Sequence, residues 1–223
     1  MKLKKIASLM LAGVMAVSML TACGSKTETK PEGEGNNEGT TSSGYSAMLG
    51  EKAADTLKKK DLDKVFTFTD NADDQKALKK VIVNGVTQND IEAVTPYISV
   101  SGAWSLKTAG IKDVDEDFAK EVKATSGVSG MTGTDSVNTK VYASVWVANG
   151  DIAMDTVIGE VFNDVKASIE GAKKEGTGEG SVAVDYTYTV SVSVENVPVK
   201  YDTTKSGSVN FVGVTVTRAA EIA

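Results

Sequence analysis

The sequence predicts an α+β fold, with helices in the N-terminal half and long antiparallel β-strands in the C-terminal half. Two patterns carry this prediction. Residues 181–195 alternate valine or tyrosine with small polar residues, the pattern of a strand in an antiparallel sheet covered on one face. Residues 157–169 instead place apolar side chains on one stripe at a period of about 3.6, which predicts one amphipathic helix packed on that sheet.

The segments before the long strands are predicted mainly as helices. Apolar spacing and charged ends predict helices over residues 45–60, 70–83, 89–94 and 113–124. Residues 62–69 fit either a helix or a strand, and residues 97–107 are expected to be extended, with a possible bend at Gly102. The glycine-rich loop 125–136 is expected to be mobile.

Turn residues and alternation predict the later elements. Strands are predicted over residues 137–147, 181–195 and 208–217. The first of them ends at Asn149-Gly150, a strong turn signal. Pro198 favours a sheet edge or a bulge, because proline has no N–H to donate to a neighbouring strand. The apolar positions change parity between Phe211 and Val212, which predicts a bulge at that point.

Leu20-Thr21-Ala22-Cys23 is the most specific motif in the chain. Three lysines and an apolar run ending at Leu20 precede it, and that run is shorter than the roughly 20 residues that a membrane-spanning helix needs. These features describe a secretory signal peptide. The motif resembles the lipobox of bacterial lipoproteins. That resemblance implies that the Cys23 sulfur carries a diacylglyceryl group and that Cys23 is the first mature residue.

Three parts of the chain follow from these signals. Residues 1–22 are the expected lipoprotein signal peptide, residues 23–44 the lipidated cysteine with a flexible linker, and residues 45–223 a single α+β globular domain. The linker consists of Gly, Ser, Thr, Asn, Glu and Lys with one Pro, and cannot bury enough surface to offset its chain entropy. The expected location is the extracytoplasmic face of the cell membrane, with the lipid bilayer as the partner of acylated Cys23.

Composition excludes several classes of function. Removing residues 1–22 takes away three lysines and no acid, so the net charge moves from −6 to −9 (21 basic minus 30 acidic residues). Such a surface is unsuited to nucleic acid. Histidine is absent and Cys23 is the only cysteine, which excludes disulfides, Cys or His metal ligands and a Ser-His-Asp triad from the domain. We therefore expect no cofactor, no metal site and no catalytic residue.

Residues 53–65, with the sequence AADTLKKKDLDKV, carry a second resemblance. They are similar to the opening of nuclear-transport-factor-like or SnoaL-like domains in small Gram-positive lipoproteins, where a first helix, a KxxDxxK-type turn and a second helix precede a curved sheet. The resemblance implies a sheet wrapped around a pocket. It implies no particular chemistry, because such folds host binders and enzymes alike. The long second helix and the missing Trp near the C-terminal strands depart from the family pattern.

Asp113, Asp115 and Asp117 match the first three ligand positions of a calcium loop. Phe118, however, stands where that loop needs a glycine for its sharp turn. A capping box of Asp113 and Glu116 at a helix start accounts for the same residues more simply. We therefore expect a helix N-terminus here and not a metal site.

Other motifs also have structural explanations. The acidic residues 70–74 are interpreted as a helix start, with a weak surface cation left open. The glycines of residues 176–180 follow a helix and precede a strand, the reverse of a phosphate-binding loop, so they are expected to form a connector. Paired carboxylates carry no signal in a chain with 30 acids, and no S-x-x-K motif with a supporting set is present.

Aromatic side chains give the remaining candidates for a ligand site. Tyr142 and Trp146 share one face of the strand 137–147, and Trp104 lies on a comparable extended stretch. If that face is open, these aromatics form a stacking platform for a glycan or a peptide. The alternative is that the helix 157–169 covers the same face, and it is favoured because large aromatics are more often buried than exposed.

The sequence therefore predicts a membrane-anchored extracytoplasmic lipoprotein that acts as a non-enzymatic binding or structural module at the cell surface. Its expected partners are the bilayer and a glycan, peptide or envelope protein ligand, and not nucleic acid. The alternative is a cell-envelope hydrolase that uses carboxylates or Ser/Lys without histidine. Two close carboxyls with raised pKa in a cleft favour the hydrolase.

Overall fold

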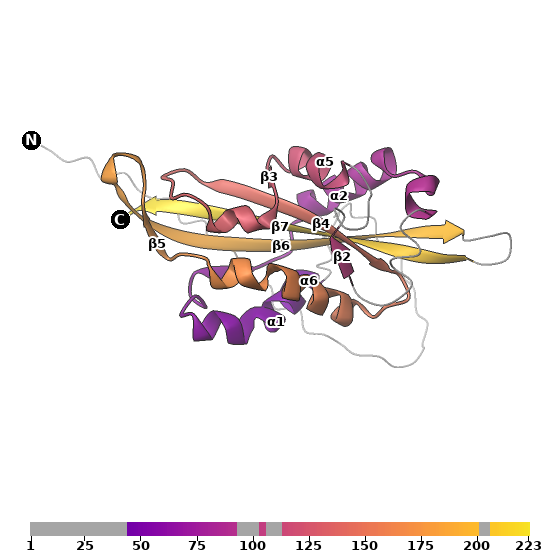
Figure 1. The fold of residues 1–223 in the computed structure, drawn as a ribbon, viewed down its shortest axis with the longest axis horizontal. Coiled ribbons are helices and arrows are strands. Elements are labelled where there is room, and N and C mark those ends of the chain that lie inside the picture. Colours follow the sequence, from indigo (N-terminus) through magenta and orange to yellow (C-terminus); the bar gives the residue numbers. More distant parts are fainter. Residues whose placement is uncertain (1–43, 93–102, 106–112, 201–205) are drawn as a thin grey trace, which may run out of the picture. The chain divides into compact units, whose positions relative to one another are not determined.

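The computed structural model describes residues 44–92, 103–105, 113–200 and 206–223 of the chain (Figure 1). The helices are α1 (Tyr45–Lys59), α2 (Ala72–Gly85), α5 (Val114–Glu121) and α6 (Met154–Glu170), with short 3-10 helices η1 (Val128–Thr132) and η2 (Glu179–Ser181). The strands are β1 (Phe66–Phe68), β2 (Ala103–Ser105), β3 (Thr125–Ser126), β4 (Lys140–Asn149), β5 (Glu175–Thr177), β6 (Ala183–Lys200) and β7 (Ser206–Ile222).

These strands form one sheet around the three long strands β4, β6 and β7. The order is β1-β6-β7-β4-β2, with β3 also paired to β4 and β5 to β6. β7 is antiparallel to both β6 and β4, whereas the short β1 runs parallel to β6. α1, α2 and α5 precede the long strands β6 and β7, and α6 follows β4. The predicted α+β class is confirmed.

Helices cover both faces of the long strands, as Figure 1 shows, with α1 and α6 on one side and α2 and α5 on the other. The alternation in β6 predicts one covered face and one wet face. That prediction holds for Thr187 and Thr189, which are exposed. It fails at Ser191 and Ser193, which are buried where α2 packs on β6. The small polar side chains of this second face leave room for a helix.

β6 and β7 pair in one unbroken register along their length. The predicted bulge between Phe211 and Val212 is therefore wrong. Phe211 lies in the core under α2 and α5, Val212 lies in the core under α1 and α6, and both are 0% exposed. Because both faces of the sheet are covered here, apolar side chains of either parity are buried without any break in the ladder.

α6 confirms the amphipathic helix predicted after the Asn149-Gly150 turn. Its apolar stripe is buried at Val157, Ile158, Val161, Val165 and Ile169. This stripe packs against α1 and joins the core on the tyrosine and valine face of the sheet. The helix therefore covers the face of β4 that carries the candidate aromatic platform, as the favoured alternative predicted.

The outer edge of β6 pairs with the short strands β1 and β5 over part of its length, and side chains hydrogen-bond to its backbone at two further residues. The N–H of Val192 donates to Ser46 Oγ at 2.8 Å, and the N–H of Val194 donates to Gln75 Oε1 at 2.9 Å. Gln75 Nε2 donates back to the carbonyl of Val194 at 2.8 Å. In β6 the N–H groups of even-numbered residues point to this outer edge. At position 198 no described strand lies there to accept a hydrogen bond, so proline, which has no N–H, fits. The predicted edge position of Pro198 is confirmed.

The remaining predictions fall partly outside the described residues. Residues 62–69 contain a strand, β1, and residues 88–92 are helical, whereas the rest of the predicted helix 89–94 lies outside. Of the extended stretch 97–107, the described part is β2, and Gly102 lies outside. The loop 125–136 contains β3 and η1. In the described part of the chain, no helix is long and apolar enough to cross a membrane.

Candidate functional site

The structure contradicts the candidate aromatic platform at Tyr142 and Trp146. Tyr142 is 5% exposed and Trp146 is 4% exposed, and both belong to the core under α6. The indole Nε1 of Trp146 donates to Asp164 Oδ2 of α6 at 2.9 Å. The backbone of Trp104 pairs with Val147, and its side chain lies outside the described structure. The alternative, in which the amphipathic helix covers this face, is what the structure shows.

A groove between α2 and the end of α5 is the candidate ligand site. Its volume is about 390 Å³. Charged side chains of both signs and two apolar residues line it: Asp73, Asp74, Lys76, Ala77, Lys80, Glu121, Val122 and Lys123. Lys80 Nζ and Glu121 Oε1 form an ion pair at 2.7 Å that joins the two helices across it. The groove therefore combines one ion pair between the helices with a mixed-charge lining.

The acidic residues at the start of α2 have separate tasks. Asp70 accepts hydrogen bonds from the N–H groups of Gly44 at 2.9 Å and Ser46 at 3.1 Å, and so satisfies the first turn of α1. Asn71 caps α2 by accepting from the N–H of Asp73 at 3.0 Å. The helix start predicted at residues 70–74 is confirmed. Among the described residues, no group of three or more acids is placed to hold a metal ion.

Asp74 is the buried member of this acidic run, at 6% exposure. Burial raises the pKa of its carboxyl, and the nearby hydroxyls of Ser191 and Thr215 offset part of the rise. Ser191 and Thr215 lie opposite each other on β6 and β7 and are 5% exposed each. Asp74 Oδ2 and both hydroxyl oxygens lack a hydrogen-bond partner of good geometry. These atoms are shielded from solvent between α2 and the sheet, where either hydroxyl can donate to the Asp74 carboxyl.

Replacing Asp74 by Asn is expected to remove a pH-dependent loss of stability. Because its folded pKa is raised above 3.8, the folded state holds this proton more tightly than the unfolded state does. The contribution to the free energy of unfolding is therefore largest well below pH 3.8 and falls as the pH rises through the folded pKa. Denaturant melts of both proteins across this range should show wild type losing stability relative to Asp74→Asn. A difference that does not change with pH would contradict the buried, proton-holding carboxyl.

Asp115 is a second carboxyl whose pKa is raised by burial. Its Oδ1 accepts a hydrogen bond from the N–H of Val145 at 2.5 Å. Val145 lies on β4 between the residues that pair with β3 and those that pair with β2. Asp117 bonds instead to Lys120 at 3.0 Å. In the calcium-loop pattern, the Asp115 carboxylate therefore bonds to the sheet and the Asp117 carboxylate pairs with a lysine on the helix surface.

The capping box predicted at Asp113 and Glu116 is wrong. Asp113 stands at the N-cap of α5, but its side chain makes no cap hydrogen bond and its backbone is left-handed, with φ of 70°. An N-cap side chain reaches the first turn from an extended backbone, which this residue does not have. The bond between Asp115 and β4 holds the start of α5 instead.

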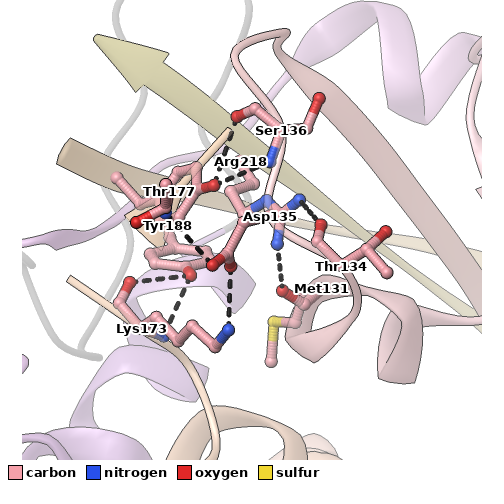
Figure 2. A network of polar contacts seen from close by, with 9 residues as sticks. Met131, Thr134, Asp135, Ser136, Lys173, Thr177, Tyr188 and Arg218 are labelled. Atoms are coloured by element: carbon pink, nitrogen blue, oxygen red, sulfur yellow. Dashed lines mark hydrogen bonds and ion pairs between the residues drawn. The ribbon is translucent and has the colours of Figure 1, made fainter. Parts of the chain in front are cut away.

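Arg218, the only arginine, is a fully buried cation on β7 (Figure 2). Its Nη1 donates to the carbonyl of Met131 at 3.0 Å and its Nη2 to the carbonyl of Thr134 at 2.9 Å. The guanidinium carbon lies 4.7 Å from the ring centroid of Tyr186. The cation therefore ties η1 and the turn after it to the end of the sheet by hydrogen bonds and a cation–π contact.

A polar network continues outward from this cation (Figure 2). Tyr188 Oη donates to the carbonyl of Lys173 at 2.9 Å, and burial raises the pKa of its phenol. Lys173 Nζ pairs with Asp135 Oδ1 at 2.8 Å, and Asp135 Oδ2 accepts from the N–H of Thr177 at 3.2 Å. The hydrogen bond from Lys173 lowers the pKa of Asp135. The network fastens the η1 turn to the connector after α6.

The glycine-rich residues 176–180 confirm the predicted connector. They include the end of β5, which pairs with β6, and the start of η2. The N–H of Thr177 is used by Asp135 and not left for a phosphate. The N–H of Gly178 likewise donates to the carbonyl of Val182 at 2.8 Å, within the connector.

The comparisons add no relative. No family model matches the chain, and neither a search of curated proteins nor one of solved structures returned a match. The resemblance of residues 53–65 to nuclear-transport-factor-like domains therefore stays a prediction.

Inside the α1 and α6 side of the sheet, an apolar cavity of about 10 Å³ is lined by Leu49, Phe66 and Val190, among others. That space is far below what small-molecule sites hold, roughly 300 Å³ or more.

Proposed function

We propose that this protein is a lipoprotein anchored on the extracytoplasmic face of the cell membrane, where its folded part acts as a non-enzymatic binding module. Leu20-Thr21-Ala22-Cys23, preceded by a basic and apolar segment, carries the proposal. The first described element is α1, and the sequence of residues 24–43 has a linker composition. Two acyl chains give stable anchoring, whereas one chain gives only marginal binding.

The chemistry of the described residues supports binding over hydrolysis. A carboxylate hydrolase of the glycosidase type needs two acids about 5–10 Å apart in one cleft, with their pKa values pushed apart. Asp74 lines the groove with a raised pKa, but Asp115 does not line it and is bonded to the backbone of β4. The volume of the groove is within the range of small-molecule sites. The proposed ligand class stays a glycan, a peptide or an envelope protein, and the groove replaces the buried aromatic face of β4 as its candidate site.

Replacing Cys23 by Ala is expected to abolish lipid labelling. In cells fed a palmitate analogue, wild type should carry the label and partition into detergent, whereas the variant should remain unlabelled and either uncleaved or shed. The acceptor sulfur is then the only chemical difference between the two proteins. Ser25→Ala, two residues downstream, is the matched control and should label like wild type. A labelled Cys23→Ala protein would contradict the anchor.

A further inference from the structure

Two Asn-Gly pairs occur in the sequence, Asn84-Gly85 and Asn149-Gly150. In such a pair the backbone nitrogen of glycine can attack the side-chain carbonyl carbon of the asparagine before it. Glycine favours this attack because it has no Cβ to shield its nitrogen. The asparagine backbone must also rotate until the two atoms meet, so the surrounding fold decides whether the reaction occurs. The two pairs lie in very different surroundings.

The pair Asn149-Gly150 is held in place at the end of β4. Asn149 pairs with Val209 of β7, and the N–H of Gly150 donates to the carbonyl of Ser208 at 2.7 Å. Oδ1 of Asn149 accepts from the N–H of Asp151 at 2.9 Å. A Cβ on Gly150 would overlap Ser208, so the backbone is tightly packed here. Hydrogen bonds therefore hold both the glycine nitrogen and the side-chain amide of this pair.

The pair Asn84-Gly85 lies at the open end of α2. Both residues are exposed, and a Cβ on Gly85 would meet nothing within 4 Å. The last turn has no basic side chain to bind its final carbonyls, and Val86 after it is extended. The N–H of Val86 donates to the carbonyl of Ile82 at 3.1 Å, and helix ends of this kind fray. Fraying lets the Asn84 backbone rotate into the geometry that the reaction needs.

We propose that Asn84 is a site of spontaneous deamidation and that the fold protects Asn149 from the same reaction. The Gly85 nitrogen attacks Cγ of Asn84, and the new C–N bond closes a succinimide ring. The side-chain nitrogen leaves as ammonia and takes the proton of the Gly85 N–H. Water then opens the ring at either carbonyl and gives aspartate or isoaspartate. Water is the only co-reactant, and the net change replaces an amide with a carboxyl group.

The product alters the end of α2 in two ways. A carboxylate at Asn84 lies at the negative end of the helix dipole, where it is destabilising. Isoaspartate also adds a methylene group to the backbone, so the helix cannot continue through it. The modification therefore accumulates with the age of the molecule and loosens the last turn of α2. This inference goes beyond the proposed membrane anchor and does not depend on it, because Cys23 takes no part in the reaction.

Peptide mapping by mass spectrometry, after long incubation of the full chain in detergent at neutral pH, tests the proposal. We expect the peptide that contains Asn84 to convert to its acid forms at least about tenfold faster than the peptide that contains Asn149. In denaturant the two sites should convert at similar rates, because the fold is then lost. Equal rates in the folded protein would overturn the proposal. So would a difference that persists in denaturant, or an Asn84 that stays intact while the denatured chain converts.

Gly85→Ala is the matched variant. The backbone of Gly85 is not left-handed and the space around it is open, so alanine fits there. Its Cβ hinders the attacking nitrogen, and alanine also favours the helix. Conversion at Asn84 should therefore slow at least about tenfold, whereas Asn149 should behave as in wild type. An unchanged rate at Asn84 in this variant would contradict attack by the Gly85 nitrogen and overturn the proposal.

Discussion

Replacing Arg218 by Met is expected to lower the free energy of unfolding by about 3 kcal/mol or more. Arg218 is fully buried, and its two hydrogen bonds satisfy the carbonyls of Met131 and Thr134. Methionine keeps much of the volume but leaves the buried carbonyl of Met131 unpaired, at about 1–3 kcal/mol, and loses the charge-assisted hydrogen bond to the carbonyl of exposed Thr134, at about 1.5–3 kcal/mol. The cation–π contact with Tyr186 is lost as well. Equilibrium denaturant melts measure the difference.

Two further variants separate charge from geometry at this site. Arg218→Lys keeps the charge but cannot reach both carbonyls with a rigid fork, so it should lose most of the same stability. Lys140→Met removes a cation from the residue that pairs with Arg218 on β4, and should stay within about 0.5 kcal/mol of wild type. A full recovery of stability in Arg218→Lys would show that charge alone, and not the two-carbonyl bridge, holds the η1 turn.

Truncating Trp146 to Ala should cost about 3–5 kcal/mol, a large share of the roughly 5–15 kcal/mol that stabilises a typical domain. Its indole is 4% exposed in the core between β4 and α6. Trp146→Phe keeps most of the packing and loses the hydrogen bond to Asp164, so it should cost about 1–2 kcal/mol. Denaturant melts report both values. An Ala variant within about 0.5 kcal/mol of wild type would contradict the core position and restore the exposed platform.

The sequence was sufficient for the fold class because its two main periods differ sharply. The stripe of α6 and the alternation in β6 each identified an element, and the Asn149-Gly150 turn separated β4 from α6. Alternation does not tell whether small polar side chains face water or a second helix layer. Ser191 and Ser193 therefore predicted a wet face that α2 covers, and the parity change at Phe211 was misread as a bulge.

The candidate site was not predictable for the same reason. Asp74 is one of several acids in residues 70–74, and nothing local marks it as the buried one. Its burial depends on β6 and β7, more than a hundred residues away in sequence, which supply the hydroxyls of Ser191 and Thr215. Arg218 is distinctive in the sequence because it is the only arginine. Its partners, Met131 and Thr134, could not be predicted because they lie in the loop 125–136, for which the sequence predicted no helix or strand.

Mass spectrometry of the mature N-terminus tests the proposed membrane anchor most directly. Protein isolated from the membrane fraction of its own cells should yield an N-terminal peptide that begins at Cys23, heavier than the unmodified peptide by a diacylglyceryl group. Alkaline hydrolysis of the acyl esters should then remove most of that added mass. An N-terminal peptide that begins at Met1, or one that begins at Cys23 with an unmodified thiol, would contradict the anchor and the extracytoplasmic location that rests on it.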